Sequence, residues 1–102
     1  MLSRRDAIES VEVRLSALSP LPEGDAWVVY ADATQERAFG WVIFYGSRFY
    51  RETGDLSHAV AGNAPFLVNR YSGEVEETGT AMPVEHYVTS YEARLARGGH
   101  RS

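Results

Sequence analysis

One run of eight residues decides the fold class: Ala38-Phe39-Gly40-Trp41-Val42-Ile43-Phe44-Tyr45. In an extended strand, successive side chains point to opposite faces of the sheet. One face would carry Phe39, Trp41, Ile43 and Tyr45, and the other would carry Val42 and Phe44. Because both faces are apolar, the run predicts a central strand that is covered on both sides. The following Gly46-Ser47 has the pattern of a two-residue hairpin turn, so we expect residues 48–52 to return as a neighbouring strand.

Residues 3–18 predict an amphipathic helix ahead of this strand. Ser3 and Asp6 have the spacing of a short capping box at its start. The apolar stripe consists of Ile8, Val11, Leu15 and Leu18. This spacing favours packing against the core, and binding of a partner is the alternative use of such a face. We then expect a strand at residues 26–30 and a chain reversal at residues 32–35.

The second half of the chain predicts a hairpin and a helix. Residues 53–65 are the least regular, with one short helical turn from Asp55 through Val60. We expect a strand at 66–70, a turn with Gly73 at positive φ, and a charged edge strand at 74–78. The last helix, residues 83–96, would hold Pro83 in its first turn. Its apolar face comprises Val84, Tyr87, Val88, Tyr91 and Leu95.

These elements predict an α+β fold with a mostly antiparallel sheet of four to five strands. An N-terminal and a C-terminal helix would pack against that sheet. One domain would fill residues 1–102, with a frayed tail at 98–102, because 102 residues suffice for one modest core.

Composition excludes several function classes. The chain has no cysteine, which removes thiol nucleophiles and cysteine-ligated metal sites. All ten basic residues are arginine, so a Schiff-base or phosphate-loop lysine is excluded. The net charge of −4 argues against nucleic acid as a partner. Ser3-Arg4-Arg5-Asp6 begins like a twin-arginine leader, but charges interrupt the apolar run that must follow, and we expect a cytoplasmic protein without a membrane segment.

No catalytic, metal or cofactor motif is complete in this sequence. Asp55 and His58 have a spacing that a metal could use on a helical turn, but a solvated loop explains them equally simply. Ser57, His58 and Asp55 lack the sequence of a nucleophile elbow. We therefore expect no catalytic residue, no metal and no cofactor.

Charge is uneven along the chain. Between Tyr71 and Glu92 there are five acids and no arginine, while the rest holds nine acids and ten arginines. We predict a partner-binding surface at Glu74, Glu76, Glu77 and Glu85. In a strand, Glu74 and Glu76 share one face and Glu77 lies on the other. A negative surface would attract a basic protein, and a merely solvated face is the alternative.

Ordered motifs between Trp41 and Tyr91 resemble the YrhB-like family, also called the immunity protein 35 family. They are Gly40-Trp41-Val42-Ile43-Phe44-Tyr45, Thr53-Gly54-Asp55, Ala61-Gly62-Asn63-Ala64-Pro65, Val68-Asn69-Arg70, Ser72-Gly73, Gly79-Thr80-Ala81-Met82-Pro83-Val84-Glu85-His86-Tyr87 and Tyr91-Glu92. The motif-bearing part of the domain is 40–92. Asn69 departs from the pattern, in which we expect an aspartate.

The resemblance implies a non-catalytic bacterial protein that binds and neutralises a cognate toxin. A chaperone-like holdase is the alternative that the family also suggests. That role needs an exposed apolar patch, for which the candidates are Trp27, Tyr30, Phe49 and Tyr50. A homodimer is compatible with either role and would change which surfaces are free.

Overall fold

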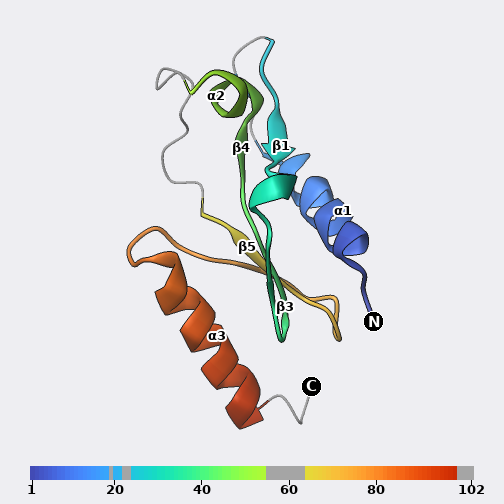
Figure 1. Ribbon diagram of the computed structural model, residues 1–102, viewed down its shortest axis with the longest axis vertical. Helices are drawn as coiled ribbons and strands as arrows, with labels where there is room; N and C mark the ends of the chain where they lie inside the picture. The colour runs from blue at the N-terminus through green and yellow to red at the C-terminus, as the bar shows by residue number, and fades with distance from the viewer. Residues whose placement is uncertain (19, 22–23, 55–63, 99–102) are drawn as a thin grey trace.

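The computed structural model describes residues 1–18, 20–21, 24–54 and 64–98, and it has the predicted α+β class (Figure 1). Its elements are α1 (Arg4–Leu15), β1 (Trp27–Val29), the 3₁₀ helix η1 (Ala31–Ala33), β2 (Gln35–Arg37), β3 (Gly40–Ile43), β4 (Tyr45–Ser47), α2 (Arg48–Thr53), β5 (Phe66–Asn69), β6 (Val75–Glu77) and α3 (Val84–Gly98). The strands form a four-stranded sheet in the order β2-β3-β5-β6 and a separate pair, β1-β4. All pairings are antiparallel, and β6 is an edge strand as predicted.

Both faces of β3 are buried, which confirms its central position. Trp41 and Ile43 pack with Phe66 and Val68 against α1, through Ala7, Val11 and Leu15. On the opposite face, Val42 and Leu67 pack against Val88 and Tyr91 of α3. Figure 1 shows the two helices on opposite sides of the sheet. The two small cores therefore share one layer of backbone, the β3–β5 pair.

Phe39 does not follow the predicted alternation of side chains between the two faces of the sheet. It packs with Val42, Val88 and Tyr91 instead of on the Trp41 face. The strand begins only at Gly40, and Ala38 and Phe39 form the turn that joins β2 to β3. The alternation therefore does not extend back to residue 39.

The apolar run 38–45 also divides into two strands. β3 ends at Ile43 and pairs with β5, while β4 starts at Tyr45 and pairs with β1. Phe44 lies between them, and its carbonyl accepts a hydrogen bond from Tyr30 N (2.8 Å). The prediction of a single continuous strand over this run is therefore wrong, although most of its side chains are buried as predicted.

Residues 46–52 were predicted as a hairpin turn and a strand, and both predictions are wrong. Gly46 and Ser47 belong to β4, and Arg48–Thr53 form helix α2. Ser47 Oγ caps this helix by accepting from Tyr50 N (3.1 Å), and Asp25 Oδ1 accepts from Phe49 N (3.1 Å). Because both acceptors serve the first free N–H groups of the helix, a serine in this position favours helix over turn.

The predicted reversal at residues 32–35 is only partly right. η1 covers its first residues, but Gln35 already belongs to β2. That strand was missed because its residues are polar, and it pairs at the sheet edge with β3.

The N-terminal helix is capped as predicted but ends early. Ser3 Oγ accepts from Asp6 N (3.1 Å), and the Asp6 carboxylate accepts from Ser3 N (3.2 Å). The helix ends at Leu15, so its buried stripe is Ala7, Val11 and Leu15, with Ile8 half-buried. Leu18 lies beyond the helix and is exposed, contrary to the prediction.

The C-terminal hairpin and helix largely follow the prediction. Gly73 has φ of 78° in the β5–β6 turn. α3 starts at Val84, just after Pro83, whose carbonyl accepts from His86 N (3.0 Å). The helical turn expected from Asp55 through Val60 lies outside the described residues. Across the described part of the chain, no helix combines the length and apolar character that a membrane span requires.

Gly40 provides a test of the β3–β5 contact. Its φ is 150°, and a Cβ atom there would lie 1.9 Å from Val68 O. We expect Gly40→Ala to lower the free energy of unfolding by about 3 kcal/mol or more, because strain and a backbone clash add. Gly54→Ala is the matched control, with φ of 72° and open space around the added atom. It should cost about 1 kcal/mol. The free energies of unfolding are measured by urea denaturation followed by circular dichroism. Equal losses for the two variants would contradict the clash between a Cβ atom at residue 40 and Val68 O.

Candidate functional site

The four predicted partner-binding glutamates lie around β6 and the start of α3. Glu74 and Glu76 point toward α3, where they reach Tyr91 and Arg94, and Glu77 points toward Arg14 of α1. The predicted division of β6 into two faces is therefore correct. Glu85 occupies the first turn of α3. The four side chains do not form one continuous face.

Three of these glutamates are paired with arginines from outside the acidic segment. Glu76 binds Arg94 and Glu85 binds Arg37, while Glu77 Oε2 lies 4.0 Å from Arg14 Nη1. Counting charges along the sequence could not show this pairing. Residues 71–92 contain no arginine, but in the folded chain Arg14, Arg37 and Arg94 lie next to them. The pairing with Glu76 raises the pKa of the Arg94 guanidinium. The negative potential at these three positions is thereby reduced.

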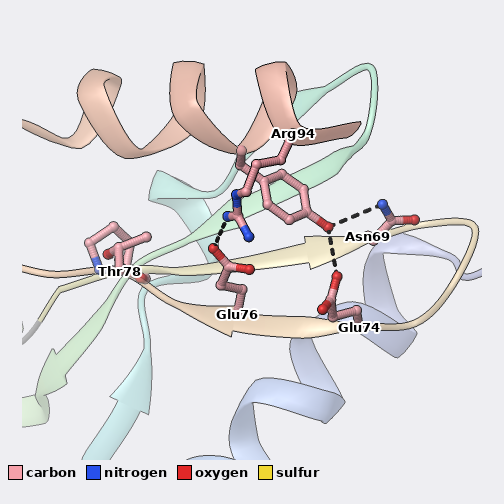
Figure 2. Close-up of polar contacts among 7 residues, drawn as sticks. Asn69, Glu74, Glu76, Thr78 and Arg94 are labelled. Carbon is pink, nitrogen blue, oxygen red and sulfur yellow. Dashed lines mark hydrogen bonds and ion pairs between the residues drawn. The ribbon is translucent and has the colours of Figure 1, made fainter. Parts of the chain in front are cut away.

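Glu74 differs from the other three because its partner is neutral. Tyr91 Oη donates to Glu74 Oε1 (3.2 Å), and Asn69 Nδ2 donates to the same Tyr91 oxygen (3.2 Å). Figure 2 shows Asn69 and Glu74 on either side of this hydroxyl, with Arg94 and Glu76 joined beside it. Tyr91 is 1% exposed. Burial raises the pKa of the Tyr91 phenol, and the charge of Glu74 raises it further.

Asn69, where the resemblance led us to expect an aspartate, uses both ends of its amide group. It is buried, and its Oδ1 accepts from Tyr71 N (2.8 Å) and Ser72 N (3.0 Å), which fixes the hairpin turn. A carboxylate could accept those bonds but could not donate to Tyr91. It would also place a second negative charge near Glu74. The amide thus serves the turn and the tyrosine at once.

A groove of about 840 Å³ opens beside this network. It lies where the β2–β3 turn, the β5–β6 turn and the C-terminal half of α3 meet. Its lining consists of Ala38, Phe39, Asn69, Tyr71, Ser72, Glu74, Glu92 and Leu95. No arginine belongs to this lining as the described residues form it. The groove combines an apolar wall with two carboxylates.

Sequence reasoning found only Glu74 among the groove residues. Phe39 and Leu95 were assigned to strand and helix packing, and Tyr71 to a turn. Tyr71 is 68% exposed. An aromatic residue in an otherwise small and polar turn, Tyr71-Ser72-Gly73, was the signal that could have indicated a binding surface.

Most of the other candidates from the sequence cannot be placed. Asp55, Ser57 and His58 lie outside the described residues. His86 is exposed on α3, with its ring edge-on to Tyr87. Among the residues that the structure describes, no group of three or more histidine, aspartate or glutamate side chains could hold a metal ion.

The aromatic residues proposed for client binding are all partly covered. Trp27 packs against the α1-side core, and Tyr30 Oη donates to Ser47 O (2.8 Å). The Arg48 guanidinium lies over the Phe49 ring, and Tyr50 is half-buried. They do not form an open apolar patch of the kind that a holdase needs.

Comparison with known proteins defines the family. A sequence model of the family described as immunity protein 35 matches residues 5–90, which include the whole four-stranded sheet and the first half of α3. The chain belongs to the immunity protein 35 family. It is also 43% identical over 60 residues to a protein of Escherichia coli (strain K12) described as uncharacterized protein YrhB. That match covers 59% of this chain and 64% of the relative, and no solved structure matches significantly.

The Tyr91 network gives a prediction for stability. Tyr91→Phe keeps the ring in the core but leaves buried Asn69 Nδ2 without its acceptor. We expect the free energy of unfolding to fall by about 1–2 kcal/mol. Tyr71→Phe removes a hydroxyl from an exposed ring and serves as the control. Both free energies of unfolding are measured by urea denaturation. If they differ by less than about 0.5 kcal/mol, the hydrogen bonds of the Tyr91 hydroxyl do not stabilise the fold as proposed.

Proposed function

We propose that this chain is an immunity protein that binds a toxin protein encoded in the same bacterial locus and blocks it by occlusion. The observation that carries the proposal is the family match over residues 5–90, whose description names immunity. The match includes the whole buried α1-side core, most of the α3-side core and most groove residues, and it ends one residue before Tyr91. Neutralisation by occlusion needs a stiff surface that excludes the toxin's substrate, and it requires no chemistry from the immunity protein.

A binding role agrees with how the polar groups near the groove are used. Asn69 is satisfied within the scaffold by Tyr71, Ser72 and Tyr91. Such a network makes a turn rigid, and rigid turns lose less entropy on binding. We infer a non-catalytic domain on this basis.

The acidic set, Glu74, Glu76, Glu77 and Glu85, is proposed to attract a basic toxin to the region around β6 and the start of α3. Three of the four carboxylates already bind arginine, so their effect would act mainly on encounter and less on final contacts. Charged groups at the rim of an interface typically affect the association rate and its salt dependence.

The function is tested by titrating the purified chain into the toxin of its locus, inactivated at its active site. A one-to-one complex with nanomolar affinity, together with loss of activity of the intact toxin, is the expected result. Absence of a complex, with the toxin fully active in excess of this chain, would overturn the proposal.

Neutralising the acidic set gives a sharper prediction. We expect the fourfold variant Glu74→Gln, Glu76→Gln, Glu77→Gln and Glu85→Gln to associate about tenfold more slowly at low salt. Glutamine is preferred to a basic residue, because charge reversal would set like charges against Arg14, Arg37 and Arg94. The matched control removes four charges elsewhere, at Glu9, Glu12, Asp32 and Glu52. Equal association rates for the two variants in stopped-flow measurements would show that net charge, and not the position of the acidic set, controls the encounter with the toxin.

A further inference from the structure

We propose that the groove beside Tyr71 receives a basic side chain, arginine or lysine, from the protein partner, with an apolar neighbour of that side chain against the groove wall. This inference rests on the proposed function, and it moves the main contact from the acidic set to the groove, which shares only Glu74 with that set. The groove residues that carry it are Tyr71, Glu74, Glu92 and Leu95.

The first argument is charge. Glu74 and Glu92 both line the groove. Within the described ranges, neither has an arginine partner, whereas Glu76, Glu77 and Glu85 all do. Among the residues that the structure describes, the one hydrogen bond to the Glu74 carboxylate comes from the neutral Tyr91 hydroxyl at Oε1. The charge of Glu74 also acts on nearby Arg94, but Arg94 is hydrogen-bonded to Glu76. Two carboxylates without an arginine ion pair among the described residues favour a cation in this groove and oppose a phosphate-bearing ligand.

The second argument is the aromatic and apolar wall. Tyr71 is 68% exposed although the other groove aromatic, Phe39, is 5% exposed. Leu95 adds a half-buried apolar surface from α3. A tyrosine that protrudes from a turn supplies large contact area at low entropic cost and can bind a cation through its ring. Together with the carboxylates, this wall suits the long aliphatic stem and charged head of arginine or lysine.

The third argument is that the groove is formed before binding. Asn69 Oδ1 holds the Tyr71 and Ser72 amides, and Ser72 Oγ accepts from Glu74 N (3.1 Å). Asn69 also fixes Tyr91, which in turn holds Glu74. A single buried amide thus holds the backbone of the turn that carries Tyr71 and, through Tyr91, one carboxylate. A preformed site of this kind favours a specific contact over diffuse attraction.

The occupant is a protein side chain because of where the groove lies. Two hairpin turns and one helix form it, and Tyr71 projects from one of those turns into solvent. Central aromatic residues with a partly covered pocket and charged groups at the edge are the usual composition of an interface hot spot.

One experiment tests the chemistry of the groove without the toxin. N-acetyl-arginine amide is titrated into the full chain while backbone amide shifts are followed by NMR, with N-acetyl-citrulline amide as the uncharged probe. We expect saturable shifts at Asn69, Tyr71, Ser72 and Glu92 with the arginine probe. The citrulline probe should not cause them, and Glu74→Gln with Glu92→Gln should abolish them. Shifts of equal size at exposed acids such as Glu9 and Glu52 would overturn the inference.

A second experiment tests the groove in the complex. Against the inactivated toxin, Tyr71→Ala should weaken Kd at least about tenfold, and Glu74→Gln with Glu92→Gln about three- to tenfold. Val13→Ala is the control for Tyr71, since Val13 is 70% exposed on α1, and Glu9→Gln with Glu12→Gln is the control for the charges. Thermal unfolding confirms that each variant is folded.

The outcomes separate the two proposals. If the wild type binds the toxin but groove and control variants agree within twofold, the groove inference is wrong and the immunity function stands. If the toxin is not bound while the arginine probe saturates the groove, the immunity function fails and the groove remains a site for cationic side chains of another protein.

Discussion

Trp41 and Ile43 point toward α1 while Val42, between them, points toward α3, so the four residues of β3 hold the two helices on opposite faces of the sheet. At the start of β3, Gly40 has no room for a side chain, because a Cβ atom there would collide with the Val68 carbonyl of β5. The hairpin turns that form the groove are attached to these same two strands. The position of the groove therefore depends on the β3–β5 contact.

Arginine shapes the surface of this protein in two ways. Arg70 is mostly buried, lies over the Trp41 ring, and binds Glu36 and the carbonyl of Arg37, which holds β2 to the sheet. Arg14, Arg37 and Arg94 instead compensate the acids around β6 and α3. A planar guanidinium can join a carboxylate and a ring at once, as Arg94 does with Glu76 and Tyr91. The acids around β6 and α3 that lack an arginine partner among the described residues then mark a smaller surface than the sequence indicates.

The sequence predicts those elements whose signals are local. The capping box at Ser3, the turn at Gly73 and the apolar face of α3 each need only a few neighbouring residues, and each is correct. The errors arise where contact with a residue far away in the sequence determines the secondary structure. Ser47 caps a helix with support from Asp25, and β2 is a strand only because β3 lies beside it. The same limit applies to the site, since Glu74 was found from its charge but the groove needs Phe39, Tyr71 and Leu95 from three separate elements.

Asn69 connects the fold to the proposed binding surface. As the last residue of β5 it is buried by the sheet, and its amide group bonds the turn on one side and Tyr91 on the other. Because Tyr91 is buried in the α3-side core and also holds Glu74, a change in the packing of α3 would move the carboxylate at the groove. Shape and charge at the groove are therefore coupled through one side chain that can both donate and accept. An aspartate there would keep the turn, but it could not donate to Tyr91 and would place a second negative charge near Glu74.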